Sequence, residues 1–69
     1  MKEKLFQIIL ALKDGKKVFS KGKNFEVIQG KNDILLKSVI TGHCIALYYY
    51  NADNTISFNY DINNLEIMN

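Results

Sequence analysis

An apolar helical pattern that stops abruptly and turns into a strand constrains the fold of this chain most. The apolar positions recur at spacings of three and four residues: Leu5, Ile8, Ile9 and Leu12. That spacing is the period of one helix face. The pattern ends at Asp14, and Gly15 is placed for the left-handed cap conformation. We therefore predict an amphipathic helix over residues 3–13 whose apolar side packs on a sheet.

Five further helix residues are assigned from the same period. Phe6 and Leu10 widen the apolar side, whereas Lys4, Gln7 and Ala11 lie opposite. The sequence therefore predicts that Phe6 and Leu10 contact the core and that Ala11 faces solvent.

Turn signals divide the rest of the chain into short strands: Lys21-Gly22, Gly30 to Asp33, Thr41-Gly42 and Asn51 to Asn54. Such clusters between alternating apolar residues are typical of hairpins. We expect five antiparallel strands, with Leu65 to Met68 as a sixth whose pairing partner is open. The predicted fold class is α+β: an N-terminal helix packed on a five- to six-stranded antiparallel meander sheet, as one domain over residues 1–69.

Centring each turn on its Gly and Asn residues predicts a register for the sheet. The predicted pairs are Val18 with Phe25, Val27 with Leu36, Leu36 with Leu47, and Leu47 with Phe58. The pleat extends this inner face to six more residues: Ile34, Ile45, Tyr49, Ile56, Tyr60 and Ile62. The same register places Glu26 opposite Lys37 on the outer face.

The outer face is apolar for a surface in water. It carries Ile28, Leu35, Val39, Ala46, Tyr48 and Tyr50. Five strands make a sheet about 20 Å wide, whereas one helix covers about 10 Å. We therefore expect either a strongly curled sheet or a homo-oligomer, with Ile28, Leu35, Val39 and Tyr48 at the subunit interface.

Composition gives little indication of a partner. The net charge is +2, and the nine lysines are spread along the chain, so nucleic acid is not indicated. The one cysteine, Cys44, favours a reducing compartment, and the apolar run from Ile8 to Leu12 is too short for a membrane span. We expect a cytoplasmic protein that does not enter membranes.

No residue set indicates catalysis or a metal. His43 and Cys44 are adjacent, so on a strand their side chains point to opposite faces and cannot share one metal ion. The carboxylates are scattered over turns and strand ends, without an acid–base pair. We expect a protein that is not an enzyme and has no cofactor.

The outward tyrosines are the best surface candidates for a binding site. Tyr48 and Tyr50 are expected to project near Ser57 and Asn59 on the neighbouring strand. Tyrosines beside small polar groups can stack on a base, and they are also common in protein interfaces. Lys23 lies in a basic, glycine-centred turn that could contact a phosphate.

The helix-to-strand junction also supports a family resemblance. The stretch from Ala11 to Val18, with Gly22 and Asn24 beyond it, resembles the opening of small phage proteins that counter Thoeris defence by sequestering a cyclic ADP-ribose signal. The stretch Asn64 to Met68 resembles their chain end. Lys23 and Leu65 stand where family members usually carry tryptophan.

The resemblance implies a non-catalytic phage or mobile-element protein that sequesters a nucleotide-derived immune signal. Lys23 and Asn24 occupy the positions of the family's motif after the glycine, which implies phosphate and polar contacts. In that interpretation the tyrosines, Ser57 and Asn59 frame the base and ribose. Two alternatives stay open: an inhibitor that binds a host protein through its outer sheet face, and a weak nucleic-acid-binding module.

Overall fold

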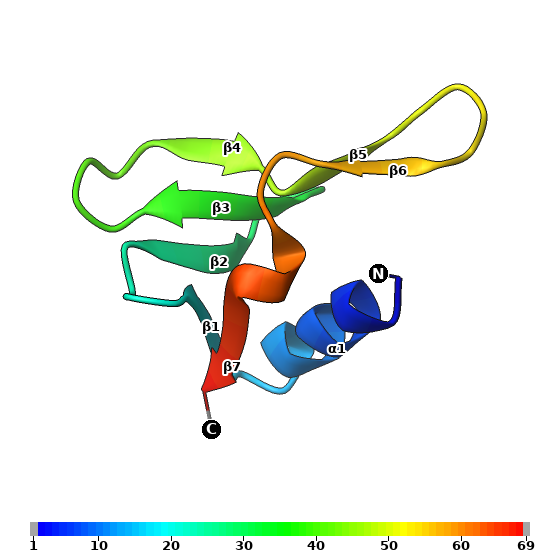
Figure 1. Cartoon of the computed structure of the whole chain (residues 1–69). Helices are drawn as coiled ribbons and strands as arrows, with labels where there is room; N and C mark the ends of the chain where they lie inside the picture. Colours follow the sequence, from blue (N-terminus) through cyan, green and yellow to red (C-terminus); the bar gives the residue numbers. More distant parts are fainter. Residues whose placement is uncertain (1, 69) are drawn as a thin grey trace.

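The protein folds as an α+β structure, described by a computed structural model over residues 2–68 (Figure 1). Its helix is α1 (Lys2–Lys13), and a 3-10 turn, η1 (Ile62–Asn64), precedes the last strand. The strands are β1 (Lys17–Ser20), β2 (Phe25–Gln29), β3 (Ile34–Ser38), β4 (Cys44–Ala46), β5 (Tyr48–Tyr50), β6 (Ile56–Phe58) and β7 (Leu65–Met68). The predicted helix packed on antiparallel strands is confirmed.

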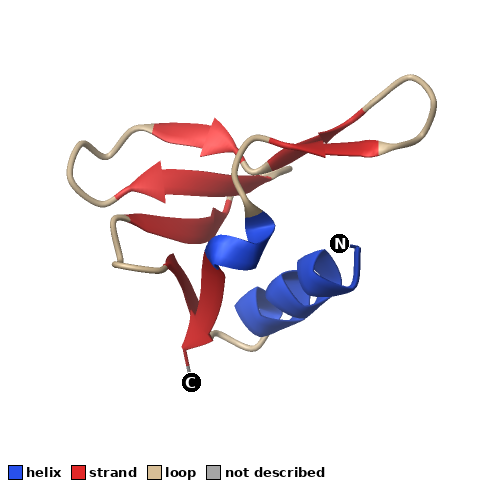
Figure 2. Ribbon diagram, viewed as in Figure 1, coloured by secondary structure: helices blue, strands red, loops and turns tan. Residues whose placement is uncertain are grey.

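The strands form two sheets rather than one continuous meander. The main sheet has the order β4-β3-β2-β1-β7, and β5 pairs only with β6 in a two-stranded hairpin. This hairpin extends beyond the main sheet in Figure 2. The last strand, whose partner the sequence left open, returns to β1 with Lys17 opposite Met68 and Ser20 opposite Leu65.

The central register is as expected, because Val27 lies opposite Leu36 and Glu26 lies opposite Lys37. The pairings on either side are wrong. Val18 lies opposite Val27 instead of Phe25.

The same kind of error recurs at the other end of the sheet. Leu36 pairs with Ile45 instead of Leu47, and Phe58 pairs with Tyr48 instead of Leu47.

The first two errors arise from the lengths of the loops. In the β1–β2 loop both Gly22 and Lys23 take positive φ values, 83° and 60°, and the Lys23 N–H donates to the Ser20 carbonyl. In the β3–β4 loop Gly42 has a φ of 79° and donates to Ser38. Each loop therefore takes more residues than the two-residue turn assumed from the sequence, which moves the register by two.

The helix faces the sheet with a side that is rotated from the predicted one. Leu5, Ile8 and Ala11 are buried, whereas Phe6 and Leu10 are 59% and 61% exposed. The predicted positions of Ala11, Phe6 and Leu10 are therefore wrong. The Ala11 carbonyl accepts a hydrogen bond from Lys16 N–H at 2.9 Å. Ala11 therefore lies beside the point where the chain turns from α1 toward β1.

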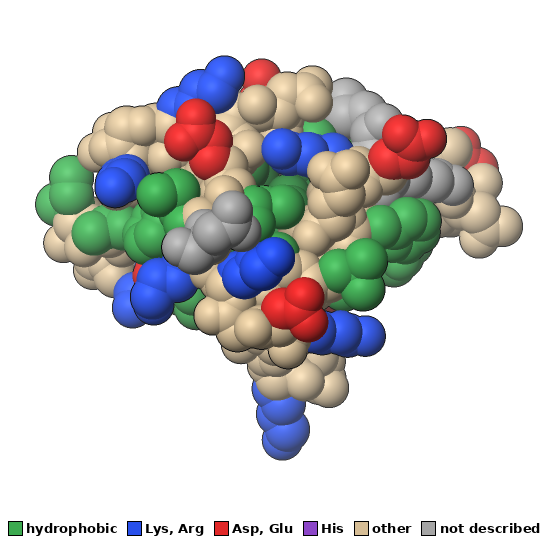
Figure 3. Space-filling view, turned by 90° about the horizontal axis from the view of Figure 1, so that it is seen from below, with side chains coloured by type: hydrophobic (Ala, Val, Ile, Leu, Met, Phe, Trp, Pro, Cys, Tyr) green, Lys and Arg blue, Asp and Glu red, His purple; other side chains and the backbone are tan. Residues whose placement is uncertain are grey.

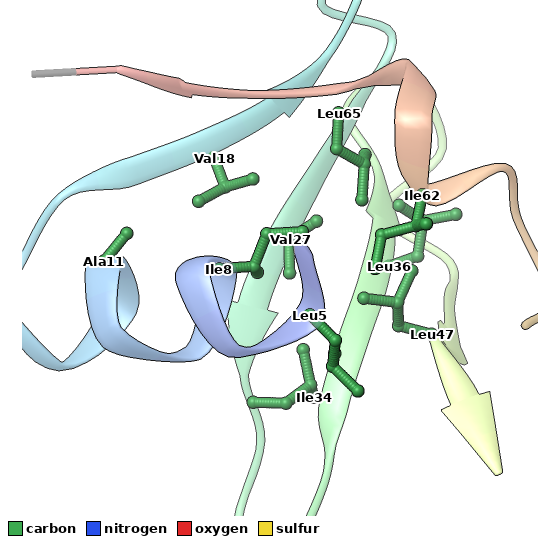
Figure 4. Close-up of a cluster of buried hydrophobic side chains, with 10 residues drawn as sticks. All are labelled: Leu5, Ile8, Ala11, Val18, Val27, Ile34, Leu36, Leu47, Ile62 and Leu65. Carbon is green, nitrogen blue, oxygen red and sulfur yellow. The ribbon is translucent and has the colours of Figure 1, made fainter. Parts of the chain in front are cut away.

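The core lies between α1, η1 and the inner face of the main sheet (Figure 4). Besides the three buried helix residues, it contains Val18, Val27, Ile34, Leu36, Leu47, Ile62 and Leu65. Two residues predicted for this inner face, Ile45 and Tyr49, are instead about half exposed, at 51% and 50%. Ile45 lies on the edge strand β4, and Tyr49 lies in the hairpin that leaves the sheet.

Leu47 is the residue at which the hairpin separates from the main sheet. Its side chain is fully buried. Its N–H donates to the Ile34 carbonyl, and its carbonyl accepts from Asn59 N–H, both at 2.9 Å. Leu47 therefore links β3 of the main sheet to the start of the hairpin.

The outer face of the main sheet lies on the side away from α1 and η1, and no further helix is found in residues 2–68 to cover it. Its apolar side chains are Phe19, Ile28, Leu35, Ala46 and Met68, all partly exposed. Viewed from below, the molecule also shows separate groups of hydrophobic side chains at its surface, with lysine and acidic side chains around them (Figure 3).

Candidate functional site

The β5–β6 hairpin has one aromatic side. Tyr48 lies opposite Phe58, and Tyr50 lies opposite Ile56, so these four side chains share a face. The Tyr48 ring meets the Tyr50 ring edge-on, with centroids 5.8 Å apart, and lies 6.3 Å from the Phe58 ring. Tyr50 is 70% exposed. An aromatic surface of this kind can contact an apolar side chain or stack on a planar group.

The other side of the hairpin is held by polar contacts. The Asn51 side-chain amide donates to Ser57 Oγ at 2.8 Å and to Thr55 Oγ1 at 2.9 Å. Thr55 in turn donates through its N–H and its hydroxyl to the Asp53 carboxylate. These bonds fix the turn, so the aromatic side is presented on an ordered element.

The environment of Tyr48 raises the pKa of its hydroxyl. Partial burial raises the pKa of Tyr48 above its usual 10.0, and the nearby Tyr50 and the Asp33 carboxylate raise it further. At neutral pH the hydroxyl is therefore a neutral donor and acceptor.

An open groove of about 530 Å³ adjoins the hairpin and continues to η1. Its lining residues are Ile56, Phe58, Asn59, Tyr60, Asp61 and Ile62. The Asn59 side chain donates to the Ala46 carbonyl at 2.8 Å, and the Asp61 carboxylate accepts from Asn63 N–H at 3.0 Å. The lining side chains include one carboxylate and no lysine, which disfavours a phosphate in the groove.

The structure brings together only part of the predicted ligand site. Tyr48 and Tyr50 are neighbours on one side of the hairpin. Ser57 lies opposite Tyr49 and is therefore on the other side, because the true register differs by one residue from the predicted register. Asn59 lies at the base of the hairpin.

Lys23 and Asn24 lie elsewhere on the molecule. They occupy the exposed β1–β2 loop, where the Asn24 carbonyl accepts from Val39 N–H at 3.0 Å. In Figure 1 this loop and the β5–β6 hairpin are at opposite ends of the main sheet. One copy of the chain therefore does not join Lys23 and Asn24 to the tyrosines in one pocket.

The predicted interface residues are also separated. Ile28 and Leu35 face each other across β2 and β3 on the outer sheet face. Val39 is exposed just after β3, whereas Tyr48 lies in the hairpin and packs against the edge of the core.

His43 and Cys44 are both exposed and near the β3–β4 loop. The cysteine thiol lies 3.7 Å from the Gly42 carbonyl. Residues 2–68 contain no group of three or more His, Cys, Asp or Glu side chains placed to hold a metal. Within the same span, no helix is long and apolar enough to cross a bilayer.

Comparisons with protein-family models, with curated proteins and with solved structures find no match to this chain. Function is therefore inferred from the surfaces of the protein itself.

The sequence interpretation missed two features. The exposed helix pair Phe6 and Leu10 was assigned to the core, although its spacing of four residues also fits a separate apolar stripe. The separation of the hairpin at Leu47 was missed because residues 44–50 form one continuous run without Gly, Pro or another turn residue.

Proposed function

We propose that this protein is a non-catalytic binding protein that contacts a partner protein through the aromatic side of its β5–β6 hairpin. The observation that supports this proposal most is the cluster of Tyr48, Tyr50 and Phe58 rings, with Tyr50 largely exposed at the end of a projecting element. Exposed tyrosines with a hydroxyl and a large apolar ring are enriched at interfaces.

The adjoining groove supports a protein partner more than a phosphate-bearing nucleotide. Ile56, Phe58 and Ile62 provide apolar lining, and the polar side chains of Asn59 and Asp61 already make local hydrogen bonds. An apolar side chain of a partner could enter this groove without displacing those bonds. A phosphate in the groove would lie near the Asp61 carboxylate, and the two negative charges would repel each other.

The resemblance to anti-Thoeris proteins supports a phage or mobile-element origin and makes a host protein the expected partner. It also keeps sequestration of a nucleotide-derived signal as a second candidate function. The feature that favours this second candidate is the exposed Tyr50 ring, which can stack on a base.

One pair of variants tests the first candidate. Tyr50→Ala removes the exposed aromatic ring, and Tyr49→Ala is the matched control because Tyr49 is an exposed neighbour on the opposite side of the hairpin. We expect Tyr50→Ala to reduce capture of the partner from host extract by at least about tenfold, whereas Tyr49→Ala changes it little. Equal effects of both variants would contradict the assignment of the aromatic side.

Calorimetric titration with cyclic ADP-ribose isomers and cyclic dinucleotides tests the second candidate. Heat of binding that is lost in Tyr50→Ala would support nucleotide sequestration and count against a protein partner at this surface. The ligand should be recovered chemically unchanged, because we propose binding without catalysis.

A further inference from the structure

The centre of the outer sheet face has a pattern that is complementary to itself. On β2 and β3, Ile28 lies opposite Leu35, and one pleat further along Glu26 lies opposite Lys37. All four side chains are partly exposed. The two central strands therefore present an apolar pair beside a pair of opposite charges.

The flanking strands continue this pattern. On β1, Phe19 lies opposite Glu26, and on β4, Cys44 lies opposite Lys37 and Ala46 lies opposite Leu35. Lys17 Nζ lies 3.8 Å from the Glu26 carboxylate.

We propose that this outer face binds a second copy of the chain, related by a two-fold axis that runs between β2 and β3 and parallel to them. This rotation places β2 over the partner's β3. Glu26 then faces the partner's Lys37, and Ile28 faces the partner's Leu35. Each contact occurs twice, so four apolar side chains meet at the axis beside an alternating square of four charges.

Charge favours this axis over its neighbours. A two-fold axis along β2 would stack Glu26 on the partner's Glu26, and an axis along β3 would stack Lys37 on the partner's Lys37. Like charges directly opposite each other are destabilising. An axis between β1 and β2 would place Ile28 over the partner's Lys17, which sets an apolar side chain against a charged one.

Charge also favours a second copy over a strongly charged partner. The outer face carries two lysines, Lys17 and Lys37, and two glutamates, Glu26 and Glu66, so its net charge is zero. A partner with the same alternation faces each of the two central charges, Glu26 and Lys37, with a charge of opposite sign. A second copy provides that alternation by symmetry.

The size of the face indicates a weak dimer. Four overlapping strands of three to five residues cover about 20 Å by 15 Å, or about 300 Å² on each copy. Stable interfaces bury about 800 Å² per partner. We therefore expect reversible dimerisation at micromolar or higher concentrations.

Charge reversal with mixing tests the proposal. Sedimentation velocity from about 5 to about 300 µM should show a monomer–dimer equilibrium for the wild type. Glu26→Lys and Lys37→Glu should each weaken self-association by at least about tenfold, because each places like charges face to face. An equimolar mixture of the two variants should recover a dimer, since the first variant then presents lysine at both positions and the second presents glutamate at both.

Glu66→Lys on β7 is the matched control, because Glu66 lies on the same face but outside the overlap of β1 to β4. It should dimerise like the wild type. Circular dichroism and urea titration verify that every variant is folded. A monomeric wild type over the whole range, variants that dimerise normally, or a mixture that stays monomeric would each overturn the proposal.

This inference does not depend on the proposed function. Tyr50→Ala should leave the dimer unchanged, because Tyr50 lies in the hairpin and outside the main sheet. The two proposals can therefore fail separately.

Discussion

Leu47 is expected to be a major stability determinant, and Ile45 provides a matched comparison. Both are aliphatic and lie two residues apart, so the sequence predicts both side chains on the inner face of one strand. In the structure Leu47 is fully buried, whereas Ile45 is 51% exposed. Truncation of each to alanine therefore compares a core position with an edge position in the same segment.

The expected losses differ several-fold. Leu47→Ala removes a buried isobutyl group and leaves a cavity, which costs about 3 to 4 kcal/mol of unfolding free energy. Ile45→Ala removes a side chain that is half in water, so about 1 kcal/mol is expected. A domain of 69 residues has a total stability of about 3.5 to 10 kcal/mol, so Leu47→Ala should remove between about a third and all of it.

Urea titration followed by circular dichroism measures both losses. Thermal unfolding followed by circular dichroism should show a fall in Tm of about 12 to 30 °C for Leu47→Ala and of about 4 to 8 °C for Ile45→Ala. Equal losses would contradict this difference in burial between Leu47 and Ile45. They would indicate that β4 continues straight into β5 and that both side chains share one core.

Other predictions follow from single contacts. Ser20→Ala should lower the free energy of unfolding by about 1 to 3 kcal/mol, because the buried Ser20 Oγ accepts a hydrogen bond from the Phe25 N–H at 3.1 Å. The same urea titration measures this loss. The pKa of Tyr48 is raised in the folded state, so the protonated hydroxyl contributes to the stability of the fold. This contribution is complete below pH 10.0 and is lost as the pH rises through the folded-state pKa. In Tyr48→Phe the free energy of unfolding should therefore fall less steeply than in the wild type as the pH rises above 10.0. Cys44→Ser and His43→Ala should each change stability by about 0.5 kcal/mol or less and leave binding intact, since both residues are exposed.

The sequence was sufficient for the architecture because local signals were strong there. The helical period, the Gly15 cap and the alternation in residues 25–38 each agreed with a helix on an antiparallel sheet, and the β2–β3 register followed from the Gly30 to Asp33 turn. Loop length was harder to predict. Lys23 has a positive φ although it is not a glycine, so the sequence does not indicate that the turn includes it. The predicted β1–β2 loop is therefore too short.

The candidate site was predicted less well, because it depends on register and on position in space. A difference of one residue between β5 and β6 moves Ser57 to the side away from Tyr48. The separation of Lys23 from the tyrosines follows from the strand order, in which the hairpin leaves the sheet beyond β4. Neither fact could be obtained from residue spacing along the chain.

The proposed function makes the aromatic side of the hairpin the binding surface. Site-specific photo-crosslinking tests it most directly, with p-benzoylphenylalanine placed at position 50 in one protein and at position 49 in another. The two positions lie on one strand and on opposite sides of the hairpin. We predict that irradiation in host cells gives a defined adduct from position 50 and little from position 49. Equal adducts from both positions, or adducts from position 49 alone, would show that the aromatic side is not the binding surface.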